Sequence, residues 1–216
     1  MVEELGHKYI TIEGNIGVGK TTLSHMLAEE YNSQLILEQF TDNPFLPFFY
    51  EDPSRYAFPV ELFFMTERHK QLQRQLLNRN LFHNEIISDY FFIKTILFAK
   101  SNLNEEEYRL FQRLFSILNA NFPKPDILVY LHRSVDKLMD HIKLRGREYE
   151  LKIERPYLQK IQDSYFEYFK SEITFPVLVI DIENMDFINN ISHYEEIKQL
   201  IAKSYPPGLH RVSLLI

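Results

Sequence analysis

One run of residues near the amino terminus has the types and spacing needed to hold phosphate groups. The pattern G-x-x-x-x-G-K-[ST] is matched at every fixed position by Gly14, Asn15, Ile16, Gly17, Val18, Gly19, Lys20 and Thr21. Glycines let backbone N–H groups close around phosphate oxygens, the lysine reaches the β and γ phosphates, and the threonine hydroxyl binds Mg²⁺. An apolar segment precedes the run and helical spacing follows it, which disfavours a simple glycine turn with a solvated lysine. We therefore expect this phosphate-binding loop (P-loop), extended to Thr22, to bind a nucleoside triphosphate.

Two carboxylates follow apolar segments elsewhere in the chain. Glu38 comes directly after residues 35–37, and Asp89 follows residues 85–88. If both segments are strands of a parallel sheet, the carboxylates lie at its carboxyl edge, where ligands bind. A carboxylate there can take the proton of a hydroxyl group that accepts a phosphate. Two simpler roles stay open, a solvated strand end for Glu38 and a helix cap for Asp89.

Two arginines flank a glycine in a charged segment. Arg145 and Arg147 stand on either side of Gly146, after a helical pattern. Guanidinium groups match the geometry of phosphates and can stabilise charge on a transferring phosphoryl group. We interpret residues 145–153 as a lid that closes over the nucleotide, the alternative being a solvated run of charges.

The elements that must position these side chains alternate along the chain. Strands are expected at about 9–13, 35–37, 85–88, 126–131 and 176–181, and helices at about 20–31, 57–80, 91–101, 104–120, 135–144, 154–170 and 193–204. Residues 39–56 are punctuated by Pro44, Pro47 and Pro53 and are predicted to form a long loop. Apolar strands alternating with helices predict an α/β fold with a five-stranded parallel sheet covered by helices on both faces.

Composition narrows the possible functions. The chain has 216 residues, no cysteine and a formal net charge of −6, so we expect one domain over 1–216, no thiolate chemistry and no role in binding nucleic acid. We expect no membrane contact and a cytoplasmic location, because no apolar run is long enough to cross a bilayer. A regulatory GTPase is excluded, because none of the six glycines lies three residues after an Asp and no Asn-Lys pair occurs.

Several motifs together resemble those of the deoxynucleoside kinase family, in particular the bacterial deoxyadenosine and deoxyguanosine kinases. They are IEGNIG at 12–17, Leu37-Glu38, YEDPSRYAF at 50–58, RGRE at 145–148 with Tyr157-Leu158 downstream, and Asp181 through Asn184 to Asp186-Phe187. The resemblance covers nearly the whole chain. It implies a P-loop kinase fold with strand order 2-3-1-4-5, ATP with Mg²⁺ as phosphate donor, and the 5′-hydroxyl of a deoxynucleoside as acceptor, in nucleotide salvage. It also implies a homodimer through the long helices near 57–80 and 91–120.

The resemblance assigns roles to individual residues. Catalysis is expected from Lys20, Glu38 as general base, Asp89, Arg145 and Arg147, with Thr21 and Asp89 near Mg²⁺. Asn184, Asp186 and Phe187 are expected at the adenine of ATP. Tyr50 and Glu150 are expected at the sugar 3′-hydroxyl, and Glu61, Arg68 and Phe98 at the nucleoside base. Glu38 and Asp89 are also expected to contact the nucleoside. Tyr90 and His141 stand where the family usually or sometimes carries arginine, so the cation at the transferring group stays open, with Arg68 as a candidate.

Glu61 bears on which base is preferred. The family usually has glutamine there, whereas an ionised carboxylate only accepts hydrogen bonds. Guanine presents two adjacent donors and matches it, while adenine fits only if Glu61 is protonated. The prediction is a purine deoxynucleoside, with deoxyguanosine ahead of deoxyadenosine. Two alternatives remain: a nucleoside monophosphate kinase similar to thymidylate kinase, and a P-loop binding module without catalysis.

Overall fold

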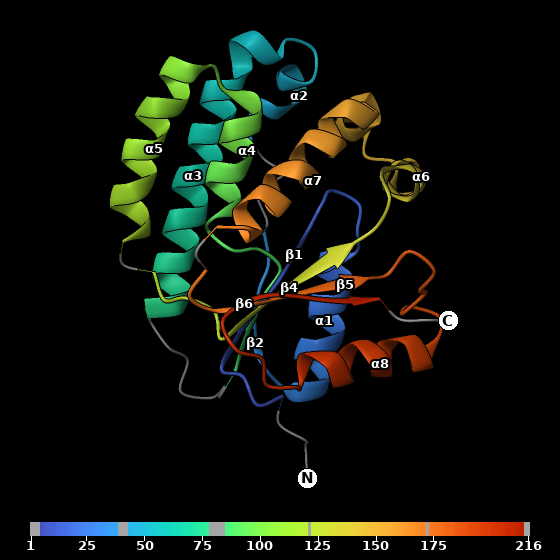
Figure 1. The fold of residues 1–216 in the computed structure, drawn as a ribbon. Helices are drawn as coiled ribbons and strands as arrows, with labels where there is room; N and C mark the ends of the chain where they lie inside the picture. The colour runs from blue at the N-terminus through green and yellow to red at the C-terminus, as the bar shows by residue number, and fades with distance from the viewer. Residues whose placement is uncertain (1–4, 39–42, 78–84, 121, 172, 214–216) are drawn as a thin grey trace.

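A parallel β-sheet forms the centre of the molecule (Figure 1). The computed structural model describes residues 5–38, 43–77, 85–120, 122–171 and 173–213. In these ranges the strands are β1 (Tyr9–Gly14), β2 (Gln34–Ile36), β3 (Ile86–Ser88), β4 (Ile127–His132), β5 (Pro176–Asp181) and β6 (Gly208–Ser213). They follow the order β2-β3-β1-β4-β5-β6, and every neighbouring pair is parallel. The carboxyl ends of the strands therefore meet along one edge, which carries the P-loop.

Helices cover both faces of the sheet, as Figure 1 shows. The helices are α1 (Lys20–Tyr31), α2 (Leu46–Phe49), α3 (Pro53–Leu77), α4 (Lys94–Asn102), α5 (Glu105–Asn119), α6 (Val135–Arg145), the 3₁₀ helix η1 (Glu148–Lys152), α7 (Arg155–Phe169) and α8 (Ile191–Ile201). Helices α1 and α8 pack on one face, and α4 and α7 pack on the other, with α3 and α5 outside α4. Among the described residues no helix has the length and apolarity to cross a membrane.

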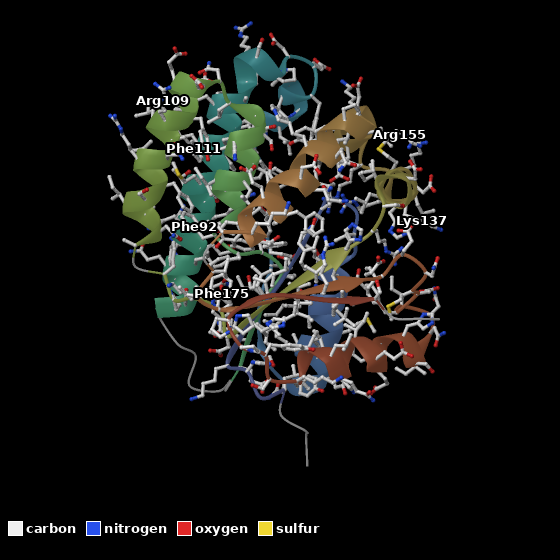
Figure 2. The ribbon with its side chains drawn as sticks, in the orientation of Figure 1. Phe92, Arg109, Phe111, Lys137, Arg155 and Phe175 are labelled. Carbon is white, nitrogen blue, oxygen red and sulfur yellow. The ribbon has the colours of Figure 1, made fainter. Side chains whose placement is uncertain are left out.

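The central strands are buried on both faces, which explains their continuous apolar sequences. In β4, Val129 and Leu131 face the core with α1 and α8, while Leu128 and Tyr130 face the core with α4 and α7. This alternation follows from the two-residue period of a strand. A third core joins α3, α4 and α5, where the rings of Phe92 and Phe115 stack with centroids 5.2 Å apart. Figure 2 shows Phe92 and Phe111 between these helices.

The fold matches the α/β prediction, with corrections at its margins. The prediction of five strands was wrong: β6 adds a sixth at the edge, parallel to β5. The predicted loop over 39–56 contains α2, and α3 begins at Pro53 rather than near residue 57. Residues 39–42 of that loop, and residues 78–80 of the helix predicted to end there, lie outside the described residues.

Candidate active site

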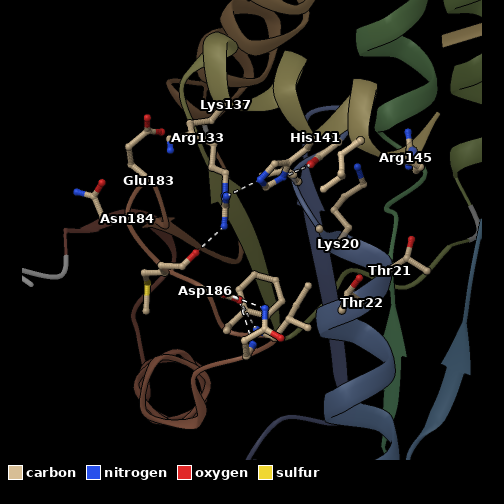
Figure 3. Close-up of a pocket in the computed structure, with 18 residues that line it drawn as sticks. Lys20, Thr21, Thr22, Arg133, Lys137, His141, Arg145, Glu183, Asn184 and Asp186 are labelled. Atoms are coloured by element: carbon tan, nitrogen blue, oxygen red, sulfur yellow. Dashed lines mark hydrogen bonds between the residues drawn. The ribbon is translucent and has the colours of Figure 1, made fainter. Parts of the chain in front are cut away.

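The P-loop borders a cavity of about 760 Å³ (Figure 3). Its walls come from the start of α1, from α6 and from the segment between β5 and α8. The lining residues are Gly17, Val18, Gly19, Lys20, Thr21, Thr22, Arg133, Lys137, His141, Leu144, Arg145, Glu183, Asn184, Met185, Asp186, Phe187, Ile188 and Asn189. We call it the donor cavity. Of the predicted nucleotide-binding residues, Gly14, Asn15 and Ile16 lie outside this lining set.

The P-loop is held in place from behind by buried polar contacts. The Glu13 carboxylate accepts hydrogen bonds from the N–H of Phe91 (2.7 Å), the hydroxyl of Tyr165 (2.8 Å) and the N–H of Gly14 (3.3 Å). Burial raises the pKa of Glu13, and the charges of Lys94 and Lys20 oppose that rise. Asn15 points away from the cavity and donates to the carbonyl of Leu158 on α7 (2.8 Å). The sequence did not reveal these supporting roles, which tie the loop to α7 and to the segment that follows β3.

Lys20 lies along the mouth of the P-loop. Its Nζ donates to the carbonyl oxygens of Gly14 (3.0 Å) and Asn15 (2.9 Å). Burial and the nearby ammonium of Lys94 lower the pKa of Lys20 to about 8, against the opposing pull of Glu13, Glu38 and Asp89. A phosphate beside Lys20 would restore the preference for the charged ammonium, which suits a phosphate ligand.

A chain of contacts joins the P-loop to the opposite wall of the donor cavity. His141 Nδ1 lies 3.0 Å from the carbonyl of Gly17, and its Nε2 lies 3.0 Å from Arg133 Nη1. Because the carbonyl only accepts and the guanidinium only donates, the neutral imidazole protonated on Nδ1 satisfies both contacts. Arg133 also donates through Nη2 to the carbonyl of Met185 (2.7 Å). Arg133 was missed in the sequence, where only its position after an apolar strand marks it.

The segment between β5 and α8 forms the far wall of the donor cavity. Asp186 accepts hydrogen bonds from the backbone of Ile188 and Asn189 and from the side chain of Asn189. Its own N–H donates to His193 Nδ1 (2.9 Å). These bonds, the side-chain bond of Asn189 first, lower the pKa of Asp186. Phe187 is buried with its ring against Gly19. Asp186 thus shapes the wall through its turn, and Phe187 through packing.

Asp89 joins the P-loop to the segment that follows β2. Its Oδ2 accepts from the hydroxyl of Thr21 (2.6 Å), and its Oδ1 accepts from the N–H of Glu38 (2.7 Å). A hydroxyl and a carboxylate at this distance are hard oxygen donors that fit Mg²⁺, which takes few protein ligands and completes its shell with phosphates and water. No cluster of three or more His, Cys, Asp or Glu side chains able to bind a metal by itself occurs among the described residues. The pair therefore suits an ion that arrives with a nucleotide.

A second cavity, of about 130 Å³, lies between α3, α4, η1 and α7. Its lining residues are Ile16, Glu38, Leu46, Phe49, Tyr50, Val60, Glu61, Phe64, Arg68, Lys94, Phe98, Asn102, Arg147, Tyr149, Glu150 and Tyr157. We call it the acceptor cavity. All the residues predicted to contact a nucleoside line it, except Asp89. Lys94 and Asn102 were missed in the sequence, because a polar residue near either end of an apolar helix resembles an ordinary helix boundary.

Glu38 is held by two cations at one end of the acceptor cavity. Arg68 Nε and Nη2 lie 2.8 Å and 2.6 Å from Glu38 Oε1, and Lys94 Nζ pairs with Oε2. Burial alone would raise the pKa of Glu38, but the attraction and hydrogen bonds of Lys94 and Arg68 hold it well below its usual range. Arg68 Nη1 also donates to the hydroxyl of Thr95 (3.1 Å). Glu38 is therefore an ionised carboxylate with a fixed orientation.

Tyr90 turns away from the cavity. Its hydroxyl donates to Gln71 Oε1 (2.6 Å), and its ring is fully buried in the core of α3, α4 and α5. Position 90 therefore supplies no cation to the acceptor cavity.

Glu61 lies in the acceptor cavity, away from bulk solvent. Its Oε1 accepts from the amide of Asn102 (2.6 Å), which also donates to the hydroxyl of Tyr157 (3.3 Å). Its Oε2 is buried without a hydrogen-bond partner among the described residues. Burial raises the pKa of Glu61 to about 7, and the charge of Arg68 and the bond from Asn102 limit that rise. An unpaired buried carboxylate oxygen is costly, so this atom is available to a ligand.

The two arginines of the predicted lid converge on one carboxylate. Arg145 Nε donates to Glu150 Oε2 (3.0 Å), and Arg147 Nη1 donates to Glu150 Oε1 (3.3 Å). Arg145 lines the donor cavity, while Arg147 and the buried Glu150 line the acceptor cavity with Tyr50. Segment 145–153 contains a 3₁₀ helix and spans the boundary between the cavities.

Comparison with known proteins agrees with this arrangement. The family model described as deoxynucleoside kinase matches residues 10–205. Deoxyguanosine kinase of Bacillus subtilis is 34% identical over 204 residues, covering 90% of this chain and 98% of that protein. The deoxyadenosine/deoxycytidine kinase of the same organism is 30% identical, and the match covers 89% of this chain and 91% of that protein. Deoxyadenosine kinase from M. mycoides with bound dATP superposes with a TM-score of 0.77 at 26% identity, covering 90% of this chain and all of that one. The chain belongs to the deoxynucleoside kinase family.

Proposed function

We propose that this kinase transfers the γ-phosphate of ATP to the 5′-hydroxyl of a purine deoxynucleoside, as a step in nucleotide salvage. The observation that carries the proposal is the bridge through Asp89, which contacts Thr21 of the P-loop and the backbone of Glu38. Because this bridge links residue 38 to the P-loop helix, it supports a position for Glu38 beside the donor phosphates. A carboxylate in that position serves a hydroxyl acceptor.

The chemistry follows from these positions. The 5′-oxygen forms a bond to the γ-phosphorus as the bond from phosphorus to the oxygen of ADP breaks, and the proton of the 5′-hydroxyl passes to Glu38. Lys20 and the P-loop N–H groups hold the donor phosphates. Thr21 and Asp89 would hold Mg²⁺, which when bound neutralises charge on the phosphates. Arg145 and Arg147 would leave Glu150 to contact phosphate oxygens as segment 145–153 closes as a lid.

The alternative acceptor, a nucleoside monophosphate, fits less well. Such an acceptor already carries negative charge and needs cations at its phosphate, whereas the acceptor cavity presents Glu38 at that end. Without a reaction at Glu38, the cations that line this cavity already have carboxylate partners: Arg68 and Lys94 pair with Glu38, and Arg147 pairs with Glu150. A binding module without catalysis would leave the half-buried and closely oriented carboxylate of Glu38 without a use.

The preference for a purine rests on Glu61. When Glu61 is ionised, its oxygens match the N1–H and 2-amino donors of guanine. When it is protonated, its free Oε2 could donate to N1 of adenine while Oε1 accepts from the 6-amino group. Thymine is disfavoured because its two carbonyl acceptors flank a single donor. We therefore propose deoxyguanosine as the preferred substrate, followed by deoxyadenosine.

Two further features belong to the proposal. A cytoplasmic location fits an enzyme that uses ATP. A homodimer is supported by α5, where Leu110 and Ile117 are 50% and 70% exposed and lie seven residues apart on one face. Apolar residues at that spacing form a stripe suited to a helical partner.

Parallel assays of ADP release test the reaction. The four natural deoxynucleosides and their monophosphates are supplied in turn to the protein with ATP and Mg²⁺, and Glu38→Gln is assayed beside it. We expect turnover with deoxynucleosides only, and a loss of kcat by about 10²–10⁴ in Glu38→Gln while ATP still binds. Turnover with monophosphates alone, or near-normal kcat in the variant, would refute the proposal.

A further inference from the structure

Lys94 is a buried cation in the acceptor cavity. It is the first residue of α4, only 6% exposed, and its Nζ pairs with Glu38 Oε2. The ammonium also lies 5.4 Å from the centre of the Phe98 ring. A lysine this deeply buried is rarely found without an anionic partner. The charge of Lys94 adds to burial in lowering the pKa of Lys20.

The two cations on Glu38 are held in different ways. Arg68 is anchored by bonds to Glu38 and Thr95, and its guanidinium packs 4.9 Å from the centre of the Phe64 ring. Lys94 Nζ has Glu38 as its single hydrogen-bond partner within the described ranges. A lysine is a point charge on a flexible stem, whereas an arginine fork is rigid. Lys94 is therefore the cation that can change partners.

The proposed reaction removes the partner of Lys94. Once Glu38 takes the proton of the 5′-hydroxyl, its carboxyl is neutral and no longer balances two buried cations. At the same time negative charge lies on the oxygens of the transferring group. A buried ammonium without an anion is unfavourable, so the phosphoryl oxygens become its best partner.

We propose that Lys94 is a catalytic residue whose ammonium moves from Glu38 Oε2 to a non-bridging oxygen of the transferring phosphoryl group. The move frees Oε2 for the proton of the 5′-hydroxyl and places positive charge where the transition state needs it. The bond changes remain those given above, from the 5′-oxygen to phosphorus and from phosphorus to ADP, and Lys94 gives up no proton. The inference rests on the proposed role of Glu38 as the general base.

The test compares ground-state with transition-state binding in Lys94→Met, which keeps the length of the side chain without its charge. Kcat should fall by about 10²–10³, as for the loss of one buried charge at a transition state. The Kd of a non-hydrolysable ATP analogue should change by less than about threefold, as for a ground state that the ammonium does not contact. The Kd of ADP with aluminium fluoride and deoxyguanosine, which mimics the transferring group, should rise in parallel with the loss of kcat.

Two further variants keep the test decisive. Lys100→Met removes an exposed lysine of the same helix, paired with Glu167, and should leave kcat and both Kd values unchanged. Lys94→Ala should regain activity with added alkylammonium ions if the charge itself is needed. Equal weakening of the analogue and the fluoride complex, or no rescue in a folded Lys94→Ala protein, would overturn the inference. If Glu38→Gln keeps near-normal kcat, the proposed base fails first, independently of Lys94.

Discussion

Two carboxylates in one small cavity have pKa values shifted in opposite directions. Glu38 and Glu61 both lose solvent on folding, which raises the pKa of each. Glu38 gains two cations in direct contact, and its pKa falls well below its usual range. Glu61 gains one amide donor and a more distant Arg68, so its pKa stays raised, at about 7. Different partners on the same side chain thus produce an ionised group and a group that titrates near neutrality.

The state of Glu61 predicts a pH-dependent choice between purines. Below a pKa of about 7, protonated Glu61 favours adenine; above it, the ionised form favours guanine. The ratio of kcat/KM for deoxyguanosine to that for deoxyadenosine should therefore rise between pH 6 and pH 8, by about tenfold or more, as for one mispaired buried polar group. The charged or titratable groups facing Glu61 are Arg68, Glu38, Lys94, Tyr50 and Tyr157. Their effects on catalysis are common to both substrates and largely cancel in the ratio.

Glu61→Gln is the matched control for this pH effect. The variant keeps the size of the side chain but cannot titrate, so the ratio should become independent of pH and move toward adenine. A ratio that stays flat in the unaltered protein would remove Glu61 from base selection. A slope that persists in the variant would assign the titration to another group.

The sequence identifies the role of some site residues, whereas the role of others becomes visible only through their contacts in the fold. Lys20, Thr21 and Glu38 can be identified because a motif or a strand end fixes their surroundings. Lys94, Asn102 and Arg133 cannot, because their significance comes from partners 56, 41 and 52 positions away. The predicted roles of Asn184, Asp186, Tyr50 and Glu150 stay predictions, although these residues line the expected cavities.

At the scale of elements, the junction between β1 and α1 places the strictest demand on residue type. Gly19 has φ +105°, and a β-carbon there would lie 3.1 Å from the Phe187 ring. Gly208 at the start of β6 has a similar φ of +118° but nothing within 4 Å. Both glycines thus have a backbone conformation that would strain another residue, and they differ in crowding.

This pair gives a prediction about the P-loop. Gly19→Ala and Gly208→Ala should each lower the free energy of unfolding by about 1–3 kcal/mol, because φ is positive at both. Only Gly19→Ala should raise the KM for ATP, by about tenfold or more, since it displaces Phe187 and the P-loop N–H groups. Denaturant unfolding and steady-state kinetics on both variants check this. An equal effect on KM would show that crowding at Phe187 plays no part.

Elements also differ in how clearly the sequence marks them. Strands β1, β4 and β5 are buried on both faces and read as apolar runs, so their positions could be predicted closely. Strand β6 alternates between half-buried and exposed residues and carries His210 and Arg211, so it lacks that signal. Helix α2 has only four residues and contains Pro47, too short for a helical period to show.

At the scale of the molecule, the outer face of α5 predicts self-association. Phe111 and Phe115 bury one face of this helix, while Leu110 and Ile117 lie exposed on another. Light scattering after size exclusion should give twice the mass of the chain, and Leu110→Glu with Ile117→Glu should give the monomer. Ile191→Glu on α8, across the sheet and 68% exposed, should leave the dimer intact. A monomeric unaltered protein would contradict the proposed homodimer.

The two cavities have no lining residue in common among those that the structure describes. One is built on the P-loop, α6 and the β5–α8 segment, and the other on α2, α3, α4, η1 and α7, with Ile16 of the P-loop. This separation makes the enzyme modular for redesign. Libraries confined to Val60, Phe64, Phe98 and Asn102 would alter which nucleoside analogues are activated, while the handling of ATP stays as it is. A cell that carries such a variant could then phosphorylate a nucleoside prodrug that other cells leave unchanged.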